Sequence, residues 1–246
     1  MIIKQSERII SIGSVLSKIP GAKVILKPIN HLYLRFLNYN RNKAFKEHGI
    51  QVLKEFDELM RNNNIHYTVF AGTLLGAIRE GGLLKHDLDL DTMMFNEDYS
   101  LNTQKLLEKA GFKLLHKFEV EGGNLGREET YIKNNVTIDI YYVYQDEMFP
   151  TYQCDFWAEE GAYSMQDSMN KYGYVKVRRL EFPVSHHVRR VPFESIAVNV
   201  PENAEEWLSY RYGKNYMTPD PEFIDKGDNP NIFYWTKVKA TYQLFE

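Results

Sequence analysis

The sequence predicts an α+β fold in which a mixed β-sheet is flanked by helices. Apolar residues recur at helical spacing from about Lys43 to Asn63, and a second helix is expected at 101–110, between Ser100 and Gly111. Other short stretches alternate in polarity or are rich in β-branched and aromatic residues. The expected strands cover residues 66–71, 86–95, 112–120, 127–133 and 136–144. With 246 residues, 43% of them apolar, the chain is long enough to bury a full core.

Turn and helix signals connect these elements. Gly72 is expected to end the first strand, and residues 73–79 then form a short helix. In the last third only the helix at 204–212 is clear, with Asn203 and Glu206 resembling a capping box and Gly213 as the stop. The rest of that third is expected to be irregular. The expected turns are Gly81–Gly82, Gly122–Gly123 and Asn134–Asn135.

The charge distribution divides the chain near residue 46. Residues 1–46 hold nine Lys or Arg and one acid, so they carry +8, whereas the remaining 200 residues carry −11. We therefore expect a basic helical arm at 1–46 and a larger domain at 47–246. The arm is expected to contain separate helices, one ending at Pro20 and one from about Pro28 to Asn38. Two interpretations stay open: the arm packs on the domain with solvated basic edges, or it meets an anionic membrane surface.

The bulk composition excludes several classes of protein. A formal net charge of −3 argues against nucleic-acid binding, which usually requires a strongly basic domain. The single cysteine, Cys154, excludes an internal disulfide and a cysteine zinc cluster, and it favours a reducing cytoplasm. We expect neither a signal peptide nor a transmembrane helix, because no apolar run is long enough.

Three aspartates in the second predicted strand indicate a metal site. Asp87, Asp89 and Asp91 alternate with leucines, so their side chains are expected on one face of the strand. Neighbouring carboxylates roughly 7 Å apart repel by about 2 kcal/mol at an effective dielectric of about 20. A cation offsets that repulsion, and oxygen ligands of this kind suit Mg²⁺ or Mn²⁺.

Two other interpretations compete with a catalytic metal site. A solvated strand face leaves the apolar Leu88 and Leu90 unexplained. A calcium loop would place Asp98 at its twelfth position, where Glu is usual, and Thr92 at its sixth, where glycine is needed. The catalytic metal site therefore explains more of the pattern.

Two further features favour phosphate and metal chemistry. A glycine at a strand end lets backbone amides approach a phosphate, and a helix that begins there adds its positive end, so Gly72 and Thr73 predict a phosphate cradle. Asp139 lies among β-forming apolar residues, where a buried acid is costly unless it is paired or metal-bound. Its alternative role is that of a capping or salt-bridged aspartate.

These motifs together resemble the LicD family, which includes the fukutin-type proteins. The resemblance rests on Gly-Thr-Leu-Leu-Gly-Ala-Ile-Arg at residues 72–79, on Gly81–Gly82 and on the Asp-x-Asp-x-Asp at 87–91, and the stretch from Val200 to Pro219 is similar to the closing motif of the family. It implies a nucleotidyltransferase (polymerase-beta-like) fold for residues 47–246. Bacterial members usually carry Pro-Trp-Asp-Asp-Asp, but here Lys85, His86 and Leu88 stand instead, which leaves the donor head group open.

The resemblance also implies an activity, that of a phosphotransferase for substituted phosphate groups. Phosphocholine or a related phospho-alcohol would pass from a CDP-activated donor such as CDP-choline to a hydroxyl of a cell-surface glycan or its lipid-linked precursor, in capsule, lipopolysaccharide or teichoic acid. Asp89, Asp91 and Asp139 would be the catalytic acids and the Mg²⁺ or Mn²⁺ ligands.

Five other residues would contact the donor. These are Gly72, Thr73, Arg79, Lys85 and Asp87, although Lys85 could instead be an exposed turn residue. The protein would act in the cytoplasm, at the inner face of the cell membrane. Two alternatives stay open: a nucleotidyltransferase that moves NMP onto a sugar phosphate or a protein, and a non-catalytic binding protein of the same fold.

Overall fold

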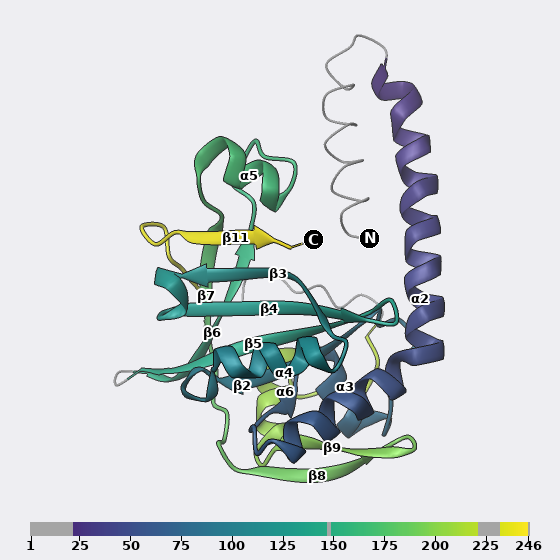
Figure 1. The fold of residues 1–246 in the computed structure, drawn as a ribbon, viewed down its shortest axis with the longest axis vertical. Helices are drawn as coiled ribbons and strands as arrows, with labels where there is room; N and C mark the ends of the chain where they lie inside the picture. Colours follow the sequence, from purple (N-terminus) through teal and green to yellow (C-terminus); the bar gives the residue numbers. More distant parts are fainter. Residues whose placement is uncertain (1–21, 147–148, 221–231, 246) are drawn as a thin grey trace.

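The computed structural model describes residues 22–146, 149–220 and 232–245 (Figure 1). Its helices are α2 (Ala22–Asn62), α3 (Ala71–Arg79), α4 (Leu101–Lys109), α5 (Met165–Tyr172) and α6 (Ala204–Tyr212). The first strands are β1 (Thr68–Val69), β2 (Asp89–Phe95), β3 (Lys113–Val120), β4 (Gly126–Lys133), β5 (Val136–Asp146) and β6 (Phe149–Trp157). The later strands are β7 (Lys176–Glu181), β8 (Val188–Phe193), β9 (Ile196–Pro201), β10 (Ile232–Tyr234) and β11 (Ala240–Leu244).

Nine strands of the described residues form one curled, mixed sheet (Figure 1). β2 pairs antiparallel with β1 and parallel with β5, and β5 pairs antiparallel with β4 and β6. The sheet continues through β3 to β11 on one side and through β7 to β10 on the other. An isolated bridge between Val175 and Ala240 then joins the start of β7 to β11, so the sheet closes back on itself. The predicted combination of a mixed sheet with helices is confirmed.

The last third is more regular than the sequence suggested. The expectation of a mostly irregular last third is wrong, because β7, β10 and β11 extend the main sheet and β8 pairs with β9 in a separate hairpin. The pairings are non-local: β11 lies against β3, and β10 lies against β7. Patterns of neighbouring residues do not reveal which distant strand a segment pairs with. The many Tyr and Arg side chains of this region also obscured the alternation of polar and apolar residues that indicates a strand.

The N-terminal arm is helical wherever it is described. α2 runs for 41 residues without a break, so the expected division into separate helices near residues 38–43 is wrong. The asparagines there weaken a helix only slightly, and packing of the following turns overrides that preference. The helix expected to end at Pro20 lies outside the described residues. In Figure 1 the second half of α2 packs beside the sheet and its first half extends past it.

Two aromatic clusters fix the helices against the sheet. Phe56 of α2 contacts Tyr67 and Phe112 edge-on, at ring-centroid distances of 5.1 and 6.1 Å. In the second cluster, the ring centroid of Phe70 lies 4.5 Å from that of Trp207 of α6 and 5.6 Å from that of Tyr141 of β5. Phe70 immediately precedes α3, so this second cluster holds the start of α3 close to β5.

Most predicted turns and caps are confirmed, and one is wrong. Asn134 and Asn135 both take positive φ, as a tight hairpin requires, and Ser100 caps α4 by accepting from Asn102 N. Asn203 does not cap α6, because its Oδ1 accepts from Ser185 N and its Nδ2 donates to Glu206. None of the helices in the described ranges is long and apolar enough to cross a membrane.

Candidate functional site

Three hydrogen bonds join Asp91 of β2 to the first residues of α3 and to Phe70, which precedes α3. The backbone amide of Gly72 donates to Asp91 Oδ2 at 3.0 Å, and the Asp91 amide donates to Thr73 Oγ1 at 2.9 Å. Phe70 N donates to the Asp91 carbonyl at 2.9 Å. The positive end of α3 therefore faces the Asp91 carboxylate.

This arrangement changes the expectation for the Gly72–Thr73 pair. Gly72 does not end a strand, since β1 ends at Val69 and α3 begins at Ala71. Thr73 is buried, and its hydroxyl oxygen accepts a hydrogen bond from the Asp91 amide. In this structure both residues position a carboxylate, and contact with a phosphate stays a prediction.

Ala71 carries backbone strain at the same place. Its φ is +39°, in the left-handed region that residues with a Cβ rarely adopt. Strain of this kind costs of order 1–3 kcal/mol and persists where surrounding contacts impose it. Here Phe70 N donates to the Asp91 carbonyl and Gly72 N donates to the Asp91 carboxylate, so hydrogen bonds to Asp91 hold the chain on both sides of Ala71.

The parallel pairing of β2 with β5 places Asp91 directly opposite Asp139. Asp139 Oδ1 accepts a 2.5 Å hydrogen bond from the hydroxyl of Thr130 on β4. Asp89 lies two residues before Asp91 on the same face, and its Oδ2 lies 3.4 Å from Nη2 of Arg41 on α2. Each of the three carboxylates thus has its own partner, and the sheet brings the three together as the sequence suggested.

The three carboxylates are neighbours but do not form a closed ligand set. Within the described residues, no group of three His, Cys, Asp or Glu side chains is already arranged to hold a metal ion. One oxygen of each carboxylate takes part in the contacts with Gly72, Thr130 or Arg41. Ligation by all three would therefore require their side chains to turn.

The pKa is raised for all four acids of the row formed by Asp87, Asp89, Asp91 and Asp139, because burial disfavours their ionised forms. Repulsion from neighbouring carboxylates adds to the rise for Asp87, Asp91 and Asp139. The pKa of Asp139 rises to about 7, first because of burial and then because of Asp89. Burial also raises the pKa of Asp91 well above its ordinary value, with repulsion from Asp89, Asp139 and Asp87 adding to it. The pKa of Asp87 rises to about 6 for the same leading reason. Burial and the neighbouring carboxylates therefore disfavour the ionised form of these acids.

Glu128 is a member of this row that the sequence reasoning missed. Burial raises its pKa strongly, and Asp139, Asp155 and Asp91 add to that rise. It lies two residues before Thr130 on β4, on the face that Thr130 shares with Asp139. The alternation of side chains along β4 could have indicated Glu128, because it places Glu128 and Thr130 on one face of the strand and Glu129 on the other. Glu129 is buried on that other face and accepts hydrogen bonds from Tyr131 and Tyr142.

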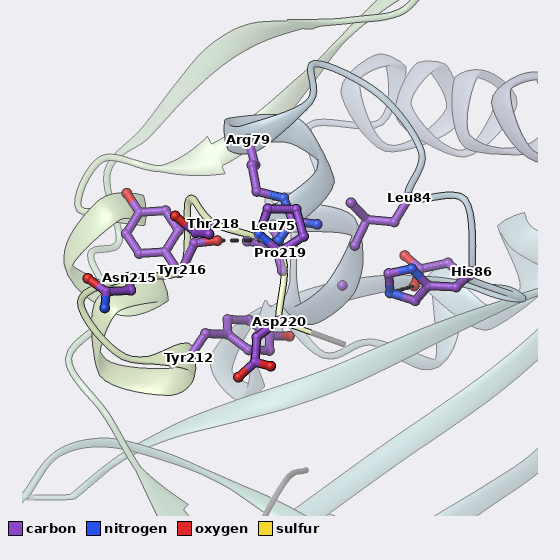
Figure 2. A pocket seen from close by; sticks show the side chains of 12 residues that line it. Leu75, Arg79, Leu84, His86, Tyr212, Asn215, Tyr216, Thr218, Pro219 and Asp220 are labelled. Atoms are coloured by element: carbon purple, nitrogen blue, oxygen red, sulfur yellow. Dashed lines mark hydrogen bonds and ion pairs between the residues drawn. The ribbon is translucent and has the colours of Figure 1, made fainter. Parts of the chain in front are cut away.

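A cavity of about 660 Å³ opens beside the row (Figure 2). Gly72 and Asp87 line it together with Arg79, and Tyr212 at the end of α6 and Tyr216 beyond it line it from the other side. Its volume lies within the roughly 300–1,000 Å³ of small-molecule sites. The acids and the cavity thus share a wall at Gly72 and Asp87.

Arg79 is the main buried cation of this cavity. Its side chain is 9% exposed, and Nη1 donates to the Tyr216 carbonyl at 3.3 Å while Nη2 lies 3.2 Å from Glu80 Oε1. Its buried Nε has no hydrogen-bond partner among the described residues. A buried donor without a partner is costly, so a ligand oxygen that reached it would be bound favourably.

The loop from Gly81 to Asp87 is fastened by the β8–β9 hairpin. Glu194 N donates to the Gly81 carbonyl at 2.7 Å, and Glu194 Oε1 accepts from Leu83 N at 3.2 Å. Lys85 is exposed in this loop, as an ordinary turn lysine would be. The loop carries Asp87 to the cavity wall, with His86 Nε2 3.8 Å from Asp87 Oδ1.

The donor set fits a hard divalent cation. The row consists of carboxylate oxygens, the ligands that Mg²⁺ and Mn²⁺ prefer. Its members are half-buried, so they are desolvated yet reachable from solvent. His86 lowers the pKa of Asp87 and Arg41 lowers that of Asp89, but both pKa values stay raised overall. A bound cation would therefore stabilise the ionised row.

Comparisons with known proteins identify the family of the chain. A family model described as the LicD/FKTN/FKRP nucleotidyltransferase domain matches residues 64–203, more than half of the chain. A mouse (Mus musculus) protein named ribitol-5-phosphate transferase FKTN is 22% identical over an aligned length of 231 residues, and the match covers 89% of this chain and 45% of the mouse protein. An uncharacterised Rickettsia typhi protein is 29% identical over 149 residues, 58% of this chain and 45% of that protein.

The chain spans less than half the length of these relatives. The family match nevertheless includes α3, β2, β4 and β5, the elements that carry Asp89, Asp91, Asp139 and Glu128 and the hydrogen bonds from the start of α3 to Asp91. The chain therefore belongs to the LicD/FKTN/FKRP family.

Proposed function

We propose that this protein transfers a phospho-head group from a CDP-activated donor to a hydroxyl of a glycan or its lipid-linked precursor. The observation that carries the proposal is the row of half-buried carboxylates at the positive end of α3, next to a cavity with a buried arginine. A nucleoside diphosphate needs both features: a cation site for its phosphates and a fixed positive group in a concave pocket.

Asp89 and Asp91 would hold Mg²⁺ or Mn²⁺, and Asp139 would either complete that ligand set or accept a proton. The cation, when bound, would neutralise phosphate charge and orient the donor. Arg79 and Asp87 would position the donor in the 660 Å³ cavity. Because the mouse relative is named as a ribitol-5-phosphate transferase, phosphoribitol is a leading head group, with phosphocholine and other phospho-alcohols as alternatives.

The proposed reaction is a nucleophilic displacement at phosphorus. The acceptor oxygen attacks the distal phosphorus of the donor, and a new P–O bond forms while the bond from that phosphorus to the bridging oxygen breaks. CMP leaves with the bridging oxygen and its electron pair. The hydroxyl proton passes to a carboxylate of the row, for which Asp139, with a pKa of about 7, is suited near neutral pH.

Binding of the donor is the first test, because it needs no acceptor. Thermal unfolding would be followed with CDP-ribitol or CDP-choline, with and without Mg²⁺. A ligand at 100 times its Kd stabilises the folded state by about 2.7 kcal/mol, so a clear rise in the melting temperature is expected only when Mg²⁺ is present. Asp91→Asn should abolish that rise, whereas Asp98→Asn, which lies beyond β2, should retain it.

Product analysis then separates the alternatives. Release of CMP supports head-group transfer, and release of pyrophosphate from a nucleoside triphosphate would show a nucleotidyltransferase instead. If no nucleotide stabilises the wild type with Mg²⁺, or if Asp91→Asn responds as the wild type does, the proposal is rejected. Contact of the basic arm with an anionic membrane on the cytoplasmic side stays a separate prediction, and residues 1–21 of that arm lie outside the described ranges.

A further inference from the structure

Two smaller cavities lie side by side over β6, β7 and β10. One, of about 320 Å³, is lined by residues that include Asp155 and Arg178. The other, of about 360 Å³, extends toward Lys239. Trp157 and Tyr234 line both, so these two rings form a ridge between the cavities.

The ridge presents aromatic surface to solvent. The rings of Trp157 and Tyr234 meet edge to face, with centroids 5.8 Å apart and planes at 88°. Tyr234 is 55% exposed although it is a large aromatic side chain. Exposed rings that separate two hollows offer flat apolar faces on which another flat apolar face can pack.

The charged groups around the ridge are largely neutralised in pairs. Arg178 Nε lies 2.9 Å from Asp155 Oδ2, and Lys176 Nζ lies 2.6 Å from Glu159 Oε1. Lys239 Nζ lies over the ring of Tyr174, 3.0 Å from its centroid. The surface therefore combines ring faces with fixed hydrogen-bonding groups and little net charge, which suits a neutral ligand rich in hydroxyl groups.

The smaller cavity lies near the acidic row. β6 pairs with β5 at Tyr144–Tyr152 and then continues beside β7, because β2 and β4 occupy both edges of β5 at Asp139. Asp155 of β6 is nevertheless close enough to Tyr141 of β5 to raise its pKa. Asp155, which lines the smaller cavity, is also close enough to Glu128 to raise its pKa.

We propose that the Trp157–Tyr234 ridge and its two cavities bind the saccharide of the acceptor. The C–H face of a sugar ring packs on the aromatic ridge, and its hydroxyls reach the ion-paired groups in the cavities on either side. The assignment of this saccharide as the acceptor rests on the proposed function. The saccharide site itself rests only on the geometry of the ridge.

A glycan array probed with the full chain tests the site. Wild type should be retained by a subset of neutral oligosaccharides, and retention should persist in about 1 M NaCl, where charge–charge attraction is screened. Trp157→Ala and Tyr234→Ala should each lower retention at least tenfold. Tyr163→Ala, at a tyrosine that is 51% exposed but does not line either cavity, is the matched control and should bind as the wild type does.

The strongly exposed Tyr234 keeps the test valid if removal of Trp157 disturbs the fold. Absence of any retained neutral glycan overturns the inference, as does equal retention of wild type and Tyr234→Ala, or retention that salt abolishes. Melting-temperature shifts with CDP-ribitol and Mg²⁺ are measured on the same proteins. A Trp157- and Tyr234-dependent glycan site without any donor effect would reject the proposed function alone, and the reverse result would reject the saccharide site alone.

Discussion

Replacement of Gly72 by alanine tests whether the acidic row is the working site. A Cβ at this position would lie 3.0 Å from Asp87 Oδ2 and 3.2 Å from Asp91 Oδ2, where ordinary contact begins at 3.4 Å. The two carboxylates must therefore retreat by about 0.4 and 0.2 Å, the differences between 3.4 Å and those distances. Both atoms are side-chain ends that can move, so the backbone need not shift.

The same substitution should leave the fold intact. Gly72 is the second residue of α3, and its φ is not positive. Alanine in a helix is favoured over glycine by roughly 0.5–1 kcal/mol, which offsets the small displacement. The added methyl group, in contrast, would press against the carboxylates of both Asp87 and Asp91 and occupy space at the wall of the cavity that the donor would use. We expect an unchanged melting temperature and a loss of about tenfold in Mg²⁺-dependent donor binding or turnover.

Gly76→Ala is the matched control on the same helix. Its Cβ would lie 2.4 Å from the carbonyl oxygen of Gly82, a backbone atom that cannot rotate away. Overpacking of this kind costs about 1–3 kcal/mol, and each kcal/mol lowers the melting temperature of a domain of this size by about 2–4 °C. Gly76→Ala should therefore lose stability, whereas Gly72→Ala should lose function.

Thermal unfolding and donor titration with Mg²⁺ on both variants distinguish these outcomes. A Gly72→Ala protein that binds the CDP donor as the wild type does would refute the assignment, because the displaced carboxylates at 87 and 91 would then have no part in binding. A Gly72→Ala protein that unfolds as early as Gly76→Ala would refute the view that only side chains must move.

Three further predictions concern single contacts. In Thr130→Val, Asp139 loses the hydrogen bond that lowers its pKa, so the acidic limb of the pH–rate profile should move to higher pH; an unmoved limb would show that ionisation of Asp139 does not limit the reaction. Arg79→Lys should raise the KM for the donor about tenfold with little change in stability, since one ammonium cannot replace the guanidinium fork; unaltered donor kinetics would remove Arg79 from the site. Arg190→Gln removes two hydrogen bonds to buried Asp57 and should cost about 2–3 kcal/mol near neutral pH by chemical denaturation. Burial raises the pKa of Asp57 but its hydrogen bonds lower it below 3.8 overall, so the contribution is complete above that pH and should fade as the pH drops below it; a gap that widens in acid would contradict this sign.

The local chemistry of the site was predictable from short-range patterns. The alternation of Asp87, Asp89 and Asp91 with leucines fixes them on one face of any strand that they form, because the side-chain period of a strand is two. The motif from Gly72 to Arg79 likewise implied a strand, a turn and a helix next to that strand. These inferences needed only the geometry of a few consecutive residues.

The roles of the same residues depended on partners that are distant in sequence. Asp139 meets Asp91 because β5 pairs with β2 in parallel, and Thr130 reaches Asp139 because β4 pairs with β5. Gly72 and Thr73 were expected to face a phosphate, yet in the structure their hydrogen bonds hold Asp91. Sequence alone could not decide whether these residues bind a phosphate or a carboxylate, since a backbone amide at the start of a helix can donate to either anion.

The amino-acid sequence by itself determined the family and the alternation that places Asp89 and Asp91 on one face of β2. Only the tertiary structure decided that Glu128 joins this row, that Arg79 lines a cavity against Tyr216, and that Trp157 meets Tyr234. The physical reason is that periodicity and turn chemistry act between neighbouring residues. Strand pairing and closure of the sheet, in contrast, are set by burial summed over the whole chain.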